Sequence, residues 1–227
     1  MDLPAWQSPT RYSEGVAIQR GWGGRMKDIP MYHDGSRSLQ DRFESRKLAD
    51  RLVEILARNA FTDDDRAFIE SRPLFFLATA DADGRPDCSY KGGLPGFVRV
   101  VDPHTLAFPN YDGNGMFKSL GNILVNPHVG MLFIDFERPN RLRVNGQATV
   151  HEDDPLIDEF TGAQLIVRVR ADAIFPNCPR YIHKMQIIEQ SAYAPCEGHT
   201  PPVPKWKQFA EFRDVLPPGD PAAPPKA

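Results

Sequence analysis

The chain has 227 residues, 41% of them hydrophobic, and a formal net charge of −3 at pH 7, so we expect one domain with extensions built on one core. This charge gives no basic field for nucleic acid, and the longest apolar run is far short of a membrane span, so neither partner is expected. The first residues lack the basic start and apolar centre of a signal peptide, and three widely separated cysteines argue against a disulfide framework, which favours a cytoplasmic protein.

The N-terminal third is expected to contain two units. Residues 1–36 combine many Gly and Pro residues with aromatic ones, which predicts an extended arm that packs on something. Residues 37–72 form a helical segment, in which 38–60 read as one amphipathic helix. Thr62, followed three residues later by Asp65, predicts the start of a second short helix.

The middle of the chain reads as closely spaced strands. Asp81, Asp83 and Gly84 predict a hairpin turn between the first two of them. Six such strands imply a small barrel. The predicted strands are 74–80, 86–90, 97–101, 105–108, 129–136 and 142–150.

A helix over 154–161 and a last long strand over 164–174 are expected to follow. The barrel domain is placed at 73–195, and 196–227 form a C-terminal extension whose Pro-rich end is expected to be disordered.

The loop between the fourth and fifth predicted strands is dense in Gly, Asn, Ser and Lys. It reads NYDGNGMFKSLGN, from Asn110 to Asn122, and leads into helix-compatible sequence. Glycines let backbone amides approach a phosphate, Lys118 supplies charge, and a following helix start adds its positive dipole end. Plain turn chemistry is the alternative, because neither the Walker pattern nor a dinucleotide fingerprint is present.

Four motifs occur in an order that resembles a known family. They are FLATADADGRP, the Gly/Lys/Ser loop ending in Asn126–Pro127, LFID and RLRVNGQA. In this order they resemble the pyridoxamine-phosphate-oxidase-like FMN-binding split barrels, closely over residues 65–150 and loosely to residue 185. The resemblance implies a six-stranded antiparallel split β-barrel with flanking α-helices. It also implies a homodimer with FMN at the subunit interface and an oxidoreductase acting on a small molecule.

The resemblance also implies which residues bind the cofactor. The strand after DGRP usually touches the flavin, and on it Ser89 and Lys91 share one face. The family's Ser-Arg-Lys phosphate clamp falls on Phe117, Lys118 and Ser119, where Lys118 alone preserves the cation. Arg141 falls where the family often has Gln near the ring. The candidate cofactor-binding residues are Ser89, Tyr90, Lys91, Pro109, Asn110, Asn114, Lys118, Ser119 and Arg141.

The C-terminal part departs from true pyridoxamine phosphate oxidases, because the family's Arg-rich substrate signature is absent after residue 175. Oxidation of vitamin B6 is therefore not expected. Arg180 and His183, in the substrate-covering region, are the candidate substrate-binding residues. No catalytic residue is named, since hydride transfer to flavin needs chiefly alignment over the ring.

Two other classes of function stay open. One is a flavin-binding module without turnover, and the other is a related barrel that binds haem or deazaflavin instead of FMN. Haem would need an axial ligand, for which His183 and His199 lie in plausible C-terminal positions.

Several other residues have a functional and a structural interpretation. Cys178 is either a redox thiol or a small loop residue. The acidic run at 63–65 is either a metal cluster or the ordinary first turn of a helix, and with no His and Cys pair at zinc spacing we expect no metal. Arg168 and Arg170 either reach a bound phosphate or form the solvent face of a strand.

Overall fold

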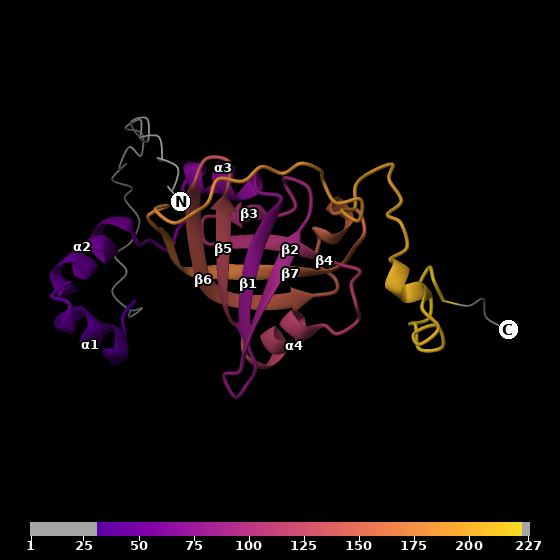
Figure 1. Cartoon of the computed structure of the whole chain (residues 1–227), viewed down its shortest axis with the longest axis horizontal. Helices are drawn as coiled ribbons and strands as arrows, with labels where there is room; N and C mark the ends of the chain where they lie inside the picture. Colours follow the sequence, from indigo (N-terminus) through magenta and orange to yellow (C-terminus); the bar gives the residue numbers. More distant parts are fainter. Residues whose placement is uncertain (1–30, 224–227) are drawn as a thin grey trace, which may run out of the picture.

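The computed structural model describes residues 31–223, and within them seven strands form one antiparallel sheet (Figure 1). The order across the sheet is β2-β1-β5-β6-β7-β4-β3. The strands are β1 Leu74–Ala80, β2 Pro86–Gly92, β3 Arg99–Asp102, β4 Thr105–Tyr111, β5 His128–Asp135, β6 Asn140–His151 and β7 Ala163–Pro176.

The sheet curls around one core. In the sheet order, β1, which carries Phe75, lies four strands away from β4, which carries Phe108. In a flat sheet the two strands would be about 19 Å apart. The two ring centroids are 5.0 Å apart, and both side chains are buried. Phe75 also packs against Phe97 and, at 5.2 Å, against Phe133 on β5. The apolar faces of distant strands therefore meet inside the curve, which makes a barrel-like core from an open sheet.

The prediction of a six-stranded barrel is corrected in its strand count. All six predicted segments are strands, but β7, which was predicted within the barrel domain and not counted among the six strands, pairs with both β4 and β6 and lies inside the sheet. In the described chain β2 and β3 are the two edges of the sheet, which is not closed. The predicted hairpin between β1 and β2 is confirmed, with Gly84 at φ 80° and its amide donating to the Asp81 carbonyl at 3.0 Å.

The helices differ from prediction where the backbone breaks. The single helix expected over 38–60 is two, α1 Asp34–Arg42 and α2 Arg46–Leu56, because Glu44 adopts a left-handed conformation with φ 52° between them. Figure 1 shows this pair at one end of the sheet. Its larger apolar side chains are exposed, namely Leu39, Phe43, Leu48, Leu52 and Ile55.

The second predicted helix is confirmed as α3, Asp63–Glu70. The Thr62 side chain accepts from the Asp65 amide, and Asp65 accepts in return from the Thr62 amide, which is a capping box. Asp65 also pairs with Arg58, so the carboxylate has a structural role. The helix expected over 154–161 is reduced to a short 3-10 turn, η1, over Ile157–Glu159.

The arginines on β7 are paired with carboxylates. Arg168 donates to the buried Asp154 at 2.5 and 2.9 Å, and Arg170 lies 3.1 Å from Asp172. The structural interpretation therefore accounts for both residues.

Within residues 31–223 no helix is long and apolar enough to cross a membrane, and no group of three or more His, Cys, Asp or Glu side chains could hold a metal ion.

Gly146 in the RLRVNGQA motif sits at a bulge where β6 passes close to β7. A Cβ at this position would lie 2.1 Å from the carbonyl oxygen of Arg170. We expect Gly146→Ala to lower the free energy of unfolding by at least about 2 kcal/mol, because the two backbones would have to separate. Urea or thermal unfolding measures this change.

Gly121 provides the matched control, since it lies in helix α4 (Lys118–Val125) and a Cβ there would meet nothing within 4 Å. Gly121→Ala should stabilise the protein by about 0.5–1 kcal/mol through helix propensity. Equal stability of the Gly146→Ala variant and the wild type would contradict the bulge geometry.

Candidate functional site

A cavity of about 1460 Å³ lies where three parts of the chain meet, and we call it the β2–β4 cavity. Strand β2 forms one wall, and the end of β4 with the loop leading into α4 forms the second. Residues from the C-terminal segment, 201–223, form the third. Eight of the nine predicted cofactor-binding residues line it, namely Ser89, Tyr90, Lys91, Pro109, Asn110, Asn114, Lys118 and Ser119.

Strand β2 presents two polar side chains on one face. Ser89 and Lys91 are half-buried, whereas Cys88 and Tyr90 on the alternate positions are exposed, so the predicted shared face of Ser89 and Lys91 is confirmed. Burial lowers the pKa of Lys91, and the nearby Asp87 carboxylate opposes that shift. Among the described residues no hydrogen bond or ion pair engages the Lys91 ammonium group. It is therefore available to an anion in the cavity.

The loop after β4 is shaped by its own polar side chains. The Asn110 amide donates to the Tyr111 carbonyl at 3.2 Å, beside an irregularity in the β4–β7 pairing. The Asn114 side chain accepts from the Met116 amide at 3.0 Å. Phe117, next in the loop, has a left-handed backbone with φ 47°. A bulky residue in that conformation marks a constrained turn, and constrained turns are frequent at ligand sites.

Helix α4 begins at this loop, and its first backbone amides have no side-chain cap among the described residues. Phe117 is its N-cap, and within the described chain no side chain caps the helix, which leaves the first-turn N–H groups of α4 without intrahelical acceptors. Ser119 in this turn is buried, and its hydroxyl lies 3.4 Å from Asp87. Hydrogen bonds donated by Arg85 lower the pKa of Asp81 in the β1–β2 turn, and the Lys118 charge adds a smaller effect in the same direction.

The charges on the cavity wall divide into two groups. Lys207 lies between Asp112 and Asp220, and these two carboxylates give this group a net negative charge. The remaining charged side chains of the wall are Lys91 and Lys118, opposed by Asp87. The part formed by β2 and α4 thus carries a net positive charge, and the amides at the start of α4 add to it. This arrangement suits an anion such as a phosphate group.

The C-terminal contribution to the cavity was not predicted from the sequence. Trp206 and Phe212 line the cavity, and their ring centroids are 5.6 Å apart in an edge-to-face arrangement. Lys207 stands beside them in the 3-10 turn η2, Lys205–Gln208. Lysine flanking a tryptophan in a Pro-rich stretch is ordinary for an exposed tail, so no local signal identified these residues.

The other predicted site residues lie elsewhere. Arg141, at the start of β6, does not line the β2–β4 cavity; its guanidinium donates to the Cys178 carbonyl at 2.8 Å, and its buried Nε atom has no partner in the described chain. Arg180 and His183 are exposed and line neither of the two cavities described here. Their role in substrate binding stays a prediction.

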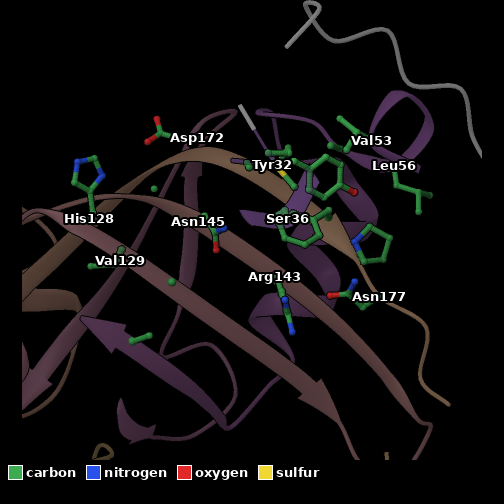
Figure 2. Close-up of a pocket in the computed structure, with 18 of the residues that line it drawn as sticks. Tyr32, Ser36, Val53, Leu56, His128, Val129, Arg143, Asn145, Asp172 and Asn177 are labelled. Carbon is green, nitrogen blue, oxygen red and sulfur yellow. The ribbon is translucent and has the colours of Figure 1, made fainter. Parts of the chain in front are cut away.

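A second cavity, of about 1010 Å³, lies between the helical pair α1–α2 and the outer face of the sheet. Figure 2 shows Val53 and Leu56 from α2 above this face, with His128, Arg143 and Asn145 on the strands below. Small residues such as Ala78 and Gly130 make that face flat. Cys178 lines its edge, and none of the predicted cofactor-binding residues lies in it.

Helix α4 is held to the sheet by one buried polar pair, the Asn122 amide donating to the Thr79 hydroxyl at 3.0 Å. Thr79→Val keeps the shape of the side chain but leaves the Asn122 amide unpaired. We expect it to lower the free energy of unfolding by about 1–3 kcal/mol. The exposed Thr161 is the control, and Thr161→Val should stay within about 0.5 kcal/mol of the wild type. Equal effects of the two substitutions would show that this pair does not anchor α4.

Comparison with known proteins places the chain in a family. The family model described as pyridoxamine 5'-phosphate oxidase matches residues 61–192, more than half of the chain. No curated protein matches the sequence.

Three solved structures similar to this chain cover 51% to 63% of it. HupZ from Group A Streptococcus is 21% identical, covering 51% of this chain and 93% of its own, with a TM-score of 0.42. An FMN-binding protein from Syntrophomonas wolfei is 12% identical, covering 63% and 97%, with a TM-score of 0.41. The heme storage protein HutZ from Vibrio cholerae is 21% identical, covering 51% and 89%, with a TM-score of 0.35.

Proposed function

The chain belongs to the pyridoxamine 5'-phosphate oxidase family, and from this we propose that it is an FMN-binding oxidoreductase acting on a small molecule. Family membership confirms the resemblance predicted from the four motifs. The observation that carries the proposal is the β2–β4 cavity, which gathers eight of the nine predicted cofactor-binding residues in one place. These residues come from β2, β4, the loop after β4 and the start of α4, and β2 and β4 are five places apart in the sheet order.

The start of α4 supports phosphate binding. Its first-turn amides are uncapped within the described residues, Lys118 provides a cation, and Ser119 places a hydroxyl in the same turn. Backbone N–H groups and the helix dipole together favour a dianionic phosphate at such a position. Because the family's arginine is absent, Lys118 would act as a point charge without bidentate geometry.

Strand β2 supports the placement of the flavin ring. The Ser89 hydroxyl and the Lys91 ammonium group lie on one face of this strand and could hydrogen-bond the polar edge of the ring. A cation there would favour the reduced, anionic form of the ring. When bound, FMN supplies the hydride- or electron-transfer chemistry, which needs no side-chain acid or base from this chain.

We further propose that a second copy of the chain completes the site. The Arg141 guanidinium has an unpartnered buried Nε atom in the described chain, and it is separated from the β2–β4 cavity. The exposed apolar face of α1 and α2 and the flat outer face of the sheet are surfaces that a second copy could cover. In a dimer Arg141 would approach the cofactor held by its partner.

An absorption spectrum of the purified protein, with mass identification of any released cofactor and titration with FMN, FAD and haem, tests the proposal. A flavin spectrum with FMN released, and saturable FMN binding, is the expected result. A Soret band with haem binding and no FMN binding would contradict it. Bound FMN that no electron donor reduces would favour a flavin-binding module without turnover.

The pH dependence of FMN binding follows from Lys91. Its pKa is lowered by burial, so the ammonium group loses its proton at a lower pH than an exposed lysine does. An anion needs the charged form, and FMN affinity should therefore fall as the pH rises through that lowered pKa. Lys91→Arg keeps the charge and should remove this alkaline decline.

Lys91→Met should bind FMN about tenfold or more weakly at neutral pH and also lack the decline. Lys47, an exposed lysine on α2, is the control, because Lys47→Met should keep the affinity and the profile of the wild type. Fluorescence titration between pH 6 and about pH 10.5 measures both properties. An alkaline decline that persists in Lys91→Arg would assign the titration to another group.

Mixing experiments test whether the site is shared between copies. Lys118→Ala and Arg141→Ala should each weaken FMN binding, and mixing them by subunit exchange should restore about a quarter of the strong sites, because half of the dimers would carry one intact site. Mixing Lys118→Ala with Lys91→Ala is the matched control. Those residues belong to the same half-site, so no intact site can form. If strong FMN binding were restored in neither mixture, the shared site would be contradicted.

A further inference from the structure

The C-terminal segment closes one side of the β2–β4 cavity without joining the core. Residues from Trp206 to Pro221 line the cavity, while the buried core cluster contains residues only up to Ile174. Figure 1 shows this segment, in yellow, beyond β4 at the end of the sheet opposite to α1 and α2. A segment with few buried apolar contacts can open at a lower free energy than the sheet it covers.

One buried lysine connects this segment to the rest of the site. The side chain of Lys207 is 3% exposed, and its Nζ atom lies 2.6 Å from Asp112 and 2.7 Å from Asp220. Burial opposes the charge of Lys207, but the hydrogen bonds that it donates to the two carboxylates outweigh burial and raise its pKa. The ammonium group is therefore charged and bonded to both carboxylates in the closed position.

The two ion pairs have different roles because of where their partners lie. Lys207 and Asp220 both belong to the C-terminal segment, and both are almost completely buried, so their pair holds the segment in its own shape. Asp112 belongs to the loop between β4 and α4, and its side chain is 60% exposed. The Lys207–Asp112 pair thus crosses from the segment to the loop that carries the candidate phosphate site.

We propose that residues 204–221 are a lid over the β2–β4 cavity and that the Lys207–Asp112 ion pair is its latch. With the latch formed, the lid covers one side of the cavity, and when the pair separates the lid swings away as a folded unit held by Lys207 and Asp220. The identity of the enclosed molecules rests on the proposed function. The latch itself depends on contacts within this chain.

The size of the cavity with the C-terminal segment in place is consistent with a lid that covers two molecules. Its volume of about 1460 Å³ is present with the lid in place. Pockets for one drug-sized ligand usually measure about 300–1,000 Å³. A cofactor and a small substrate can therefore lie together beneath Trp206 and Phe212. Lids of this kind exclude water and retain the substrate during the reaction.

Asp112→Asn separates the lid effect from simple electrostatics. Removing a negative charge beside an anion site removes a Coulomb repulsion, and this effect alone should slow the release of FMN. Breaking the latch should instead speed the release, because the lid opens more often. The substitution is at an exposed carboxylate and leaves the Lys207–Asp220 pair in place, so the variant is expected to fold.

The experiment has two readouts. Hydrogen exchange of residues 204–221 in the protein without added flavin should be protected in the wild type and about threefold or more faster in Asp112→Asn. Stopped-flow release of FMN should accelerate in the same variant. Lys205, exposed on the same 3-10 turn, provides the control, since Lys205→Met should leave both rates unchanged.

The lid would be overturned if hydrogen exchange of residues 204–221 were unprotected in the wild type. It would also be overturned if the exchange rates of this segment were equal in Asp112→Asn and Lys205→Met. Slower or unchanged release of FMN in Asp112→Asn would overturn the latch. If the wild type binds no FMN but exchange still depends on Asp112, the lid stands and the proposed function fails.

Discussion

The curl of the sheet depends on the packing of Phe75. Its ring centroid lies 5.2 Å from that of Phe133 on the neighbouring strand β5 and 5.0 Å from that of Phe108 on β4, which is four strands away in the sheet order. Aromatic side chains bury large areas, and offset and edge-to-face contacts add to that stabilisation. Because β1 is drawn towards β4, the edge strand β2, which pairs with β1, is drawn with it. The β2–β4 cavity is a consequence, since β2 and β4 are five places apart in the sheet order.

Charge pairing then determines which cations remain for a ligand. The arginines of β7 are satisfied by Asp154 and Asp172, and Arg99 at the start of β3 is satisfied by Glu159. Lys91 and Lys118 are different, because their elements place them on the cavity wall where Asp87 is the single opposing carboxylate outside the Lys207 cluster. The positive character of the site is therefore local and arises in a chain whose net charge is negative.

Features set by short-range patterns could be predicted from the sequence. Alternation of apolar residues identified the strands, and the Thr62–Asp65 spacing identified the capping box of α3. The motifs predicted Ser89, Lys91 and Lys118, which the fold brings to one cavity. The break in the N-terminal helix was missed because a left-handed glutamate, Glu44, has no distinctive local pattern.

Features set by long-range contacts could not be predicted. Lys207 and Asp112 are 95 residues apart, and each is unremarkable in its own segment. Arg141 was predicted to lie near the cofactor by family resemblance, yet within one described chain it bonds to Cys178 and lies outside the cavity. In the dimer we propose, the position of Arg141 relative to the cofactor is a property of the assembly, and one chain's sequence pattern does not encode it.

The α1–α2 pair and the C-terminal segment differ in the surfaces through which they can make contacts, and this difference has a physical consequence. The α1–α2 pair exposes apolar side chains, such as Phe43 at 71%, which favours a lasting contact with another surface. The C-terminal segment is attached through a partly exposed ion pair, which water and salt can replace at small cost. Apolar surfaces stabilise permanent contacts, whereas an exposed ion pair suits a contact that must form and break repeatedly. The loop bearing Asp112 joins that reversible contact to the start of α4, so an anion bound at α4 and the position of the lid would influence each other through one short segment.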